Sequence, residues 1–438
     1  MPDVWWIRDD LRLADNPAVV AAAERGPPLA VCVWDAEAMG ARAPGAASRV
    51  WLARSLAALS EAIAARGGRL VLARGRAEAI LPALAEGGRI HASRRPEPWA
   101  RAQARRVAET AGGDRLRLYT AALLHEPHRL QGPSGGAVGT FAAFRRRLAD
   151  PVLPEALPPP GRFADASSPD RLEDWPLLPP AREGGWERGL ARGWTPGEAG
   201  AQARLAGLGA ALAGYAQKRD RLDGSGGSGL SPHLRWGEIA PWAAWRAAGG
   251  LPNADRDVFR AELLWREFAH HRLWWDGDLE ARAVGREAAW RTSPADLRAW
   301  RRGRTGVPAV DAGMRQLWRE GWLSNRARLL AAAFLTRHLL LDWRAGEAWF
   351  WDTLVDACPA NNPFSWQWGA GCGPDPQPFF RVLNPVLQGR RHDPGAAWIA
   401  RFVPETAAWA DPHAPWEAGG PAPIVDLAEG RRRALAAA

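Results

Sequence analysis

Residues 356–368, near the end of the chain, gather most of the side chains that could do redox chemistry. Their sequence, DACPANNPFSWQW, contains a carboxylate, a thiol, two adjacent amides and two indoles. We predict a turn at Asn361, Asn362 and Pro363, because asparagine tolerates positive φ and proline does not continue a helix. A turn that holds two amides against two indoles could form the floor of a redox-cofactor site. A capped helix with two core tryptophans is the alternative interpretation.

Two upstream segments carry charged and aromatic residues at spacings that suit a binding site. The first is ELLWREF at 262–268 and the second is WLSNRAR at 322–328. In the first segment Glu262, Trp265 and Arg266 are three and four residues apart, so one face of a helix can present all three.

Together these segments resemble the flavin and lesion pocket of the DNA photolyase/cryptochrome family. The resemblance spans nearly the whole chain, from VWWIRDDLRLADN to PAPIVDLAEGRRRAL, and is greatest to the bacterial enzymes that act on cyclobutane pyrimidine dimers. It implies a parallel-sheet α/β domain followed by a larger helical domain that binds FAD. It also implies a carbon–carbon lyase that repairs these dimers in DNA, by light-driven electron donation from reduced FAD without net redox change.

The resemblance assigns a set of flavin contacts. Asn362 takes the place beside flavin N5, where a neutral amide suits an atom whose protonation changes with redox state. Asp356 contacts the pyrimidine edge of the ring with Arg328 as its charge partner, since an isolated buried charge is costly. An interhelical salt bridge is the alternative for this pair. The other implied cofactor contacts are Tyr215, Ser228, Leu230, Ser231 and Arg266.

Residues 224–229, GSGGSG, match the G-x-G-x-x-G pattern literally. A polar run precedes them instead of a buried strand, so we reject a nicotinamide site. In the resembling family this segment holds the FAD diphosphate, but Gly227 and Gly229 stand where the family usually has Thr and Arg. Cys358 likewise replaces an aspartate, and Pro359 removes a backbone N–H.

A second set of residues concerns the lesion. A pyrimidine dimer pairs poorly, so flipping it out of a duplex costs less than flipping a normal base, and it then needs an aromatic wall. The resemblance assigns that wall to Trp265 and Trp368, a hydrogen bond to the dimer to Glu262, and contact with the base edge to Asn325. The implied phosphate contacts are Arg219 and Arg326, since the guanidinium fork suits phosphate.

A third set is an electron relay. Trp290, Trp343 and Trp366 match the three tryptophans through which the family passes electrons from the surface to the flavin. With Glu262 and Asn362 they complete the implied catalytic residues. Each tryptophan taken alone would be interpreted as core.

Two other functions stay open. One is a blue-light receptor that carries FAD but repairs nothing, and the other is a nucleic-acid-binding protein without a cofactor. Histidines that the (6-4) photoproduct enzymes carry are replaced here by Asn325 and Leu329, which favours the cyclobutane dimer. Three cysteines are too few for the iron–sulfur branch of the family or for any four-cysteine metal cluster.

Composition and net charge indicate the kind of partner and the cellular compartment. The chain has 438 residues and a net charge of +9, which indicates a phosphate-rich partner such as DNA. The alternative is codon bias, because Lys218 is the only lysine. We find no secretory signal, no membrane-spanning run and no metal cluster, and therefore expect a cytoplasmic protein that associates with the nucleoid through DNA. We expect a monomer.

The elements that must position these residues divide the chain at 1–125, 126–198 and 199–438. The first range alternates short apolar runs with alanine-rich helical stretches, which predicts a parallel sheet. The runs are 4–7, 29–34, 69–73, 89–92 and 116–119. Glu97 follows the fourth run, where family members can hold a second, antenna chromophore, often a folate; a surface carboxylate is the preferred interpretation. The middle range is a connection rich in proline and glycine. The third range is the helical FAD- and DNA-binding domain, with one helix expected at 205–216.

Overall fold

The computed structural model describes residues 2–177, 186–190, 192–375 and 382–437. The chain divides into two compact units, each built from separate stretches of sequence. Unit 1 consists of Met1–Arg182, Gly193–Ala210 and Ser228–Gly277, and unit 2 of Glu183–Arg192, Ala211–Gly227 and Asp278–Ala438. The predicted contiguous ranges 1–125, 126–198 and 199–438 stay a prediction.

Unit 1 contains a five-stranded parallel sheet with the strand order β3-β2-β1-β4-β5. The central strand β1 is fully buried and pairs on both sides, with Val4 opposite Leu29 of β2 and Ile90 of β4. Burial on both faces explains its continuous apolar sequence, VWWI. The strands are β1 (Val4–Ile7), β2 (Leu29–Trp34), β3 (Leu70–Arg74), β4 (Ile90–Ser93) and β5 (Leu116–Tyr119).

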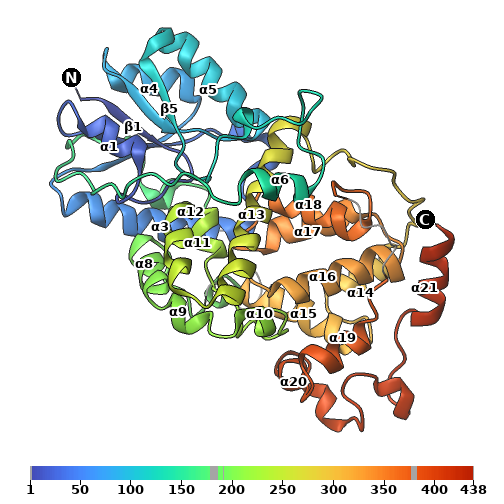
Figure 1. Ribbon diagram of the computed structural model, residues 1–438. Coiled ribbons are helices and arrows are strands. Elements are labelled where there is room, and N and C mark those ends of the chain that lie inside the picture. Colours follow the sequence, from blue (N-terminus) through green and yellow to red (C-terminus); the bar gives the residue numbers. More distant parts are fainter. Residues whose placement is uncertain (1, 178–185, 191, 376–381, 438) are drawn as a thin grey trace. The chain divides into compact units, whose positions relative to one another are not determined.

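Helices cover both faces of this sheet. The chain runs from β1 to β2 and β3 in one direction and then returns past β1 to β4 and β5, and right-handed connections in opposite directions place their helices on opposite faces. Figure 1 shows α4 and α5 on one side of the strands and α1 and α3 on the other. The helices of unit 1 are α1 (Pro17–Ala23), α2 (Ala36–Met39), α3 (Ala46–Ala64), α4 (Ala77–Ala85), α5 (Pro98–Ala111), α6 (Phe141–Arg147), α8 (Glu198–Ala206), α11 (Ser231–Arg235), α12 (Pro241–Ala247) and α13 (Asn253–Asp276).

The regular elements of unit 2 are all helices among the residues that are described, and its core gathers apolar side chains from α14 to α20. A π-helical turn (Phe334–His338) continues α16. The helices are α7 (Trp186–Gly189), α10 (Tyr215–Lys218), α14 (Pro294–Arg301), α15 (Pro308–Glu320), α16 (Asn325–Ala333), α17 (Trp343–Thr353), α18 (Asn361–Ala370), α19 (Pro385–His392), α20 (Ala397–Phe402) and α21 (Leu427–Ala436). The predicted fold class, an α/β sheet domain with a larger helical domain, is confirmed.

Two local predictions were wrong. Residues 361–363 form the first turn of α18 and not a separate turn, because proline in the first turn of a helix gives up no intrahelical hydrogen bond. The single helix expected at 205–216 is three pieces: the end of α8, α9 (Leu208–Ala211) and the start of α10. Gly207 and Gly214 lie at the two breaks, since glycine is a poor helix former.

Candidate functional site

Helix α13 of unit 1 carries Glu262, Trp265 and Arg266, as their spacing predicts. The indole of Trp265 is stacked on the ring of Phe141 in α6, with ring centroids 3.6 Å apart and planes 9° from parallel. Phe268 meets the same indole edge-on at 6.0 Å. Stacking on one face fixes the orientation of the Trp265 ring. Phe141 was assigned no role from the sequence, because it lies in the stretch predicted as a connection.

The guanidinium of Arg266 is already engaged within unit 1. Its Nη1 donates to the Glu267 carboxylate at 2.9 Å, and its Nη2 donates to the carbonyl of Ala122 at 2.9 Å. Glu267 is fully buried, so this ion pair anchors the middle of α13. The predicted phosphate contact of Arg266 must use donor capacity that these bonds leave over.

The glycine-rich loop follows α10 and not a strand, which agrees with rejecting a nicotinamide site. Ser228 accepts a hydrogen bond from the backbone N–H of Leu230 at 3.3 Å, and Ser231 begins α11. Leu230 is only 1% exposed, so its side chain belongs to the core of unit 1. A Cβ on Gly226 would lie 2.2 Å from the Lys218 carbonyl oxygen, so packing requires this glycine.

In unit 2, Arg328 and Asp356 form the predicted pair. Arg328 Nη2 donates to both carboxylate oxygens of Asp356, at 3.0 and 2.7 Å, and its Nε donates to the carbonyl of Leu323. The Asp356 side chain is 1% exposed and that of Arg328 is 26% exposed. A buried carboxylate is thus held in a fixed orientation by a guanidinium that reaches toward solvent.

Asn362, in the first turn of α18, is held by Glu347 of α17. Its Nδ2 donates to the Glu347 carbonyl at 3.1 Å and to the Glu347 carboxylate at 2.9 Å. Both residues are buried, with exposures of 8% and 3%. The amide nitrogen is therefore committed to protein, and the amide oxygen is the group that it can offer to a ligand. Sequence reasoning missed Glu347, because nothing in its spacing distinguishes it from other acidic residues.

Cys358 and Asn361 also shape the start of α18. The Cys358 Sγ accepts from the Asn361 N–H at 3.5 Å, and the Cys358 carbonyl accepts from the Asn362 N–H at 3.0 Å. Cys358 is 7% exposed. The thiol thus takes over capping contacts at a helix end, where N–H groups otherwise lack partners.

The two tryptophans of α18 differ in their surroundings. Trp366 is 2% exposed and packs edge-on against Phe350 and Trp300, at 5.0 and 6.0 Å. It also lies against Gly346 of α17, where a Cβ would come within 2.2 Å of its Cη2 atom. The Nε1 of Trp368, by contrast, is buried without a hydrogen-bond partner among the described residues. An indole donor left without a protein partner can serve a bound molecule.

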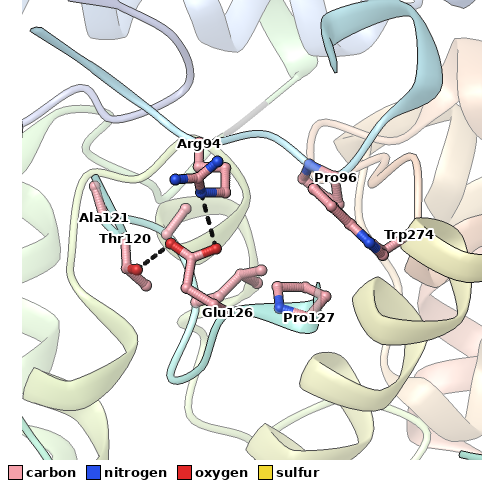
Figure 2. Close-up of a pocket in the computed structure, with 9 residues that line it drawn as sticks. Arg94, Pro96, Thr120, Ala121, Glu126, Pro127 and Trp274 are labelled. Atoms are coloured by element: carbon pink, nitrogen blue, oxygen red, sulfur yellow. Dashed lines mark hydrogen bonds and ion pairs between the residues drawn. The ribbon is translucent and has the colours of Figure 1, made fainter. Parts of the chain in front are cut away.

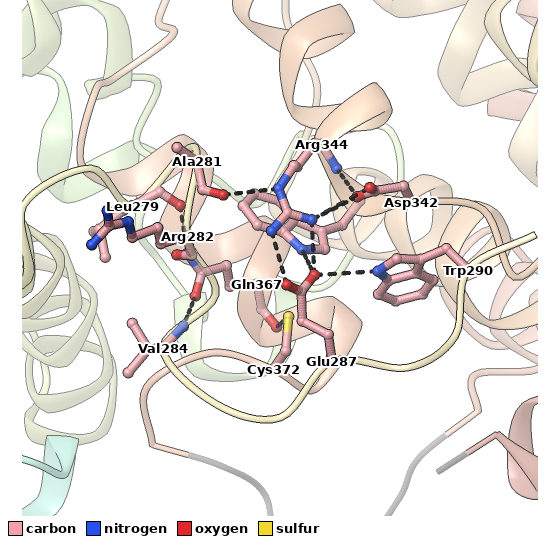
Figure 3. Close-up of polar contacts among 11 residues, drawn as sticks. Leu279, Ala281, Arg282, Val284, Glu287, Trp290, Asp342, Arg344, Gln367 and Cys372 are labelled. Atoms are coloured by element: carbon pink, nitrogen blue, oxygen red, sulfur yellow. Dashed lines mark hydrogen bonds and ion pairs between the residues drawn. The ribbon is translucent and has the colours of Figure 1, made fainter.

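The other two relay tryptophans, Trp290 and Trp343, donate to one carboxylate, that of Glu287 (Figure 3). Arg344 binds the same carboxylate through two hydrogen bonds, at 2.8 and 2.9 Å. These bonds, with those from the two indoles, lower the pKa of Glu287 to about 2. Sequence reasoning missed Glu287 and Arg344.

The predicted phosphate ligands lie near one another in unit 2. Arg326 pairs with Asp220, and the Arg219 guanidinium lies 3.7 Å from the same carboxylate. Asn325 is exposed at the first position of α16, and Tyr215 is 9% exposed at the start of α10. One carboxylate between two guanidiniums leaves this group with a net positive charge.

The place expected for an antenna chromophore is occupied by charged side chains of unit 1. Glu97 is 3% exposed and receives two hydrogen bonds from Arg95, at 2.7 and 3.1 Å, so the expected surface carboxylate was wrong. Arg95 also pairs with Asp9 at 2.7 Å. Since β1 and β4 both end here, this network fills the position at which such sheets commonly bind ligands.

The described residues of unit 1 line two cavities that bear on ligand binding. The larger, about 410 Å³, lies beyond the carboxyl ends of β2 and β3 and is lined by Trp34, Asp35, Arg74 and Arg76, among others. Figure 2 shows the smaller, where Glu126 binds Thr120 and Arg94. Its volume is about 10 Å³, which is room for a single water. Only the first can hold an organic ligand.

Within the described ranges no group of three or more His, Cys, Asp and Glu side chains is arranged to hold a metal ion. No helix in those ranges is long and apolar enough to cross a membrane.

Comparison with known proteins agrees with this architecture. Residues 3–161 match the family described as DNA photolyase, and residues 259–438 match the FAD binding domain of DNA photolyase. A deoxyribodipyrimidine photo-lyase of Agrobacterium fabrum is 42% identical, over 100% of this chain and 97% of the relative. Cryptochrome-1 of Arabidopsis thaliana is 32% identical, over 98% of this chain and 69% of that protein. The crystal structure of a bacterial class III photolyase from Agrobacterium tumefaciens superposes with a TM-score of 0.93 at 40% identity, covering 100% of this chain and 96% of that one.

The class that the fold defines is a flavoprotein with an α/β unit and a helical FAD-binding region. The chain belongs to the DNA photolyase/cryptochrome family, and the resemblance read from the sequence is confirmed.

Proposed function

We propose that this protein is a light-driven lyase that splits cyclobutane pyrimidine dimers in DNA, the reaction of a deoxyribodipyrimidine photo-lyase. The observation that carries the proposal is Trp368, whose indole N–H is buried and has no partner in the described part of the chain. An N–H withheld from protein partners leaves a donor for the oxygen-rich edge of a pyrimidine. Two relatives that cover 100% and 99% of this chain, at 42% and 38% identity, carry the same activity in their names.

FAD is the cofactor, and when bound and reduced it supplies the electron that light transfers to the dimer. The donor set of unit 2 fits it. Asp356, oriented by its hydrogen bonds with Arg328, offers an acceptor to the N–H of a flavin pyrimidine ring. Asn362, with its amide nitrogen bound to Glu347, offers its oxygen to an N–H such as reduced flavin carries at N5. Further cofactor contacts are assigned to Tyr215, Ser228, Leu230, Ser231 and Arg266.

The lesion is held by aromatic faces and by two polar side chains. Trp265 is kept in a fixed plane by Phe141, which reduces the entropy lost when a base stacks on it. Trp368 is the second aromatic wall. Glu262 donates to or accepts from the dimer and steadies the negative charge that develops on it, and Asn325 binds a base edge.

DNA binding draws on positive charge. Arg219 and Arg326 hold backbone phosphates next to the flipped lesion, and Asp220 keeps both guanidiniums in place. The net charge of +9 adds an electrostatic attraction to the phosphate backbone that does not depend on the DNA sequence. We propose that the protein is cytoplasmic, associates with chromosomal DNA and acts as a monomer.

A second chromophore, if the protein binds one, would occupy the cavity of about 410 Å³ beyond β2 and β3 and not the surroundings of Glu97. The cavity offers an indole, from Trp34, for stacking. The guanidiniums of Arg74 and Arg76 already pair with Asp170 and Glu78, but both side chains are at least half exposed and can also reach an anionic group. Glu97 has no free carboxylate to offer, because Arg95 occupies it.

One experiment tests the function. The protein is purified, its absorption spectrum is recorded, and it is illuminated under reducing conditions with an oligonucleotide that carries one thymine dimer. We expect a flavin spectrum and light-dependent recovery of intact thymines, with no recovery in the dark. A flavin spectrum without repair would establish the blue-light receptor instead, and a colourless folded protein that takes up no FAD would refute both.

A further inference from the structure

Glu287 joins the two outer members of the proposed electron relay through a single oxygen atom. Its Oε1 accepts from the Trp290 Nε1 at 3.3 Å and from the Trp343 Nε1 at 3.2 Å. Arg344 completes the cluster by donating from Nη1 to Oε1 at 2.8 Å and from Nη2 to Oε2 at 2.9 Å. Figure 3 shows the carboxylate between the Trp290 indole and the guanidinium.

The segment that carries Glu287 and Trp290 is held in place on both sides. After Trp290, Arg291 donates from its backbone N–H to Leu340 and from its side chain to Leu339, both at or below 2.9 Å. Before Glu287, the buried Gln367 side chain binds backbone groups of residues 279–284 (Figure 3). The Glu287 contacts are therefore part of an anchored structure, although its side chain is 34% exposed.

The charges of the cluster do not cancel. Arg344 also contacts the Asp342 carboxylate, at 3.2 and 3.3 Å, so one guanidinium is shared between two carboxylates. The three side chains together carry a net charge of −1. A net negative charge at the indole N–H groups stabilises a positive charge on either ring, because the charges are close and only partly solvated.

The two indoles do not experience the cluster equally. The Arg344 guanidinium carbon lies 4.7 Å from the centroid of the Trp343 ring, so a positive charge on that ring is opposed from its face. For Trp290 no guanidinium lies over the ring among the described residues. Trp343 is also fully buried, whereas Trp290 is partly exposed to water, which solvates a charge. Each difference favours positive charge on Trp290.

We propose that Glu287 is a positioning residue of the electron relay which, with Arg344, makes Trp290 the place where the positive charge comes to rest. The inference rests on the proposed function, because the oxidant is the same FAD in its oxidised form, excited by light before the reduced form is available for repair. One electron leaves Trp366, one moves from Trp343 to Trp366, and one moves from Trp290 to Trp343. The sum is one electron gained by the oxidant and one lost by Trp290. Its indole keeps its proton, because the carboxylate that receives the hydrogen bond balances the charge.

The first test needs no cofactor. Apo-protein is oxidised by a photochemical one-electron oxidant, ruthenium tris-bipyridine with persulfate, and peptide mass spectrometry counts oxidised Trp290 and Trp343. Exposed Trp318 serves as the internal reference. We expect Glu287→Gln, which keeps the side-chain shape, to lower oxidation at Trp290 by about tenfold relative to Trp318. Arg344→Gln leaves the carboxylate in place and should raise the share of oxidation at Trp343. Unchanged ratios in both variants would overturn the proposal.

The second test uses the holoprotein and flash photolysis, in which cationic and neutral indole radicals are distinguished by their absorption. We expect a long-lived cationic radical in the parent protein and a lifetime about tenfold shorter in Glu287→Gln. An equal lifetime in a variant with parental circular dichroism would refute the role of Glu287. Trp366→Phe should abolish the radical, and a radical yield equal to that of the parent protein would show that the relay is wrong. The oxidation ratios measured in the apo-protein test Glu287 independently of that result.

Discussion

Replacement of Gly346 by alanine tests whether Trp366 packs as tightly as the structure requires. Gly346 lies within α17, where alanine is favoured over glycine by about 0.8–1 kcal/mol in the absence of other contacts. A Cβ at this position would lie 2.2 Å from Cη2 of Trp366, 2.4 Å from its Cζ3 and 2.7 Å from Cδ2 of Leu335. The indole is 2% exposed and surrounded by core, so it has no room to withdraw. Overpacking of this kind costs about 1–3 kcal/mol.

The matched control is Gly313→Ala, in α15 of the same unit. Its Cβ would meet only Cη2 of Trp398, at 3.8 Å, which is ordinary contact. Both variants gain the helix-propensity term, so their difference isolates the packing term. We expect Gly313→Ala to raise the free energy of unfolding by about 0.5–1 kcal/mol and Gly346→Ala to fall about 1–3 kcal/mol below it.

Urea denaturation followed by far-ultraviolet circular dichroism measures both values, with the slope m checked for constancy. Flavin photoreduction under constant blue light supplies a second readout, since a displaced Trp366 should slow it in Gly346→Ala but not in Gly313→Ala. If Gly346→Ala is as stable as Gly313→Ala, Trp366 does not pack against α17 as described.

Three further predictions concern substrate, DNA and pH. Glu262→Ala should keep its FAD but bind dimer-containing DNA at least about tenfold more weakly, because a charge-assisted hydrogen bond is worth about 1.5–3 kcal/mol; equal repair per photon would remove Glu262 from the site. Binding should weaken with salt, and Arg326→Gln should reduce the log–log slope by about 1; an unchanged slope would show that Arg326 contacts no phosphate. Burial, reinforced by His125 and Arg272, lowers the pKa of His271 to about 3. As the pH falls, the histidine of the unfolded chain is therefore protonated before that of the folded protein. The stabilisation that the neutral ring gives the folded state is complete above about pH 6.5, and the free energy of unfolding falls by about 1.4 kcal/mol per pH unit below it. His271→Gln, which keeps an acceptor for the Val138 N–H, should flatten that fall in urea denaturation.

The strands of the sheet were predicted well, because the signal for each strand is a short run of residues that are adjacent in the sequence. All five strands lie within a residue or so of the predicted runs, since short apolar runs between helical stretches have few other interpretations. The helical breaks at 207–214 and the first turn of α18 were missed. Proline is accepted in the first turn of a helix but breaks a helix interior, and glycine commonly ends a helix but only weakens one from within. The position of the residue in the element, which sequence alone does not supply, decides between the two.

The residues that bear chemistry were easier to predict than those that hold them. Asp356 and Arg328 pair as predicted, because a buried carboxylate requires a cation and the sequence offers one at a matching place. Glu347 and Glu287, which orient Asn362 and the two outer relay indoles, were missed. A carboxylate that accepts hydrogen bonds from neutral donors looks like any other acidic residue until the fold brings the donors to it.

The loop at 224–231 shows how a departure from a family pattern can be offset elsewhere in the chain. Gly229 has φ of +64°, and a Cβ there would lie 2.6 Å from Nη1 of Arg204, so the arginine that the resemblance implies at this position would be strained. Yet Arg204 of α8 brings its own guanidinium to that spot, stacked 3.9 Å from the ring centroid of Trp194 and bound to the carbonyl of Gly193. The positive charge that an arginine at position 229 would carry is thus supplied from 25 residues earlier in the chain. Gly227 differs, because a Cβ there meets only the carbonyl oxygen of Gly224, at 3.4 Å, which is ordinary van der Waals contact. Of the two departures, the one at Gly227 is therefore the one that a threonine could reverse without a clash.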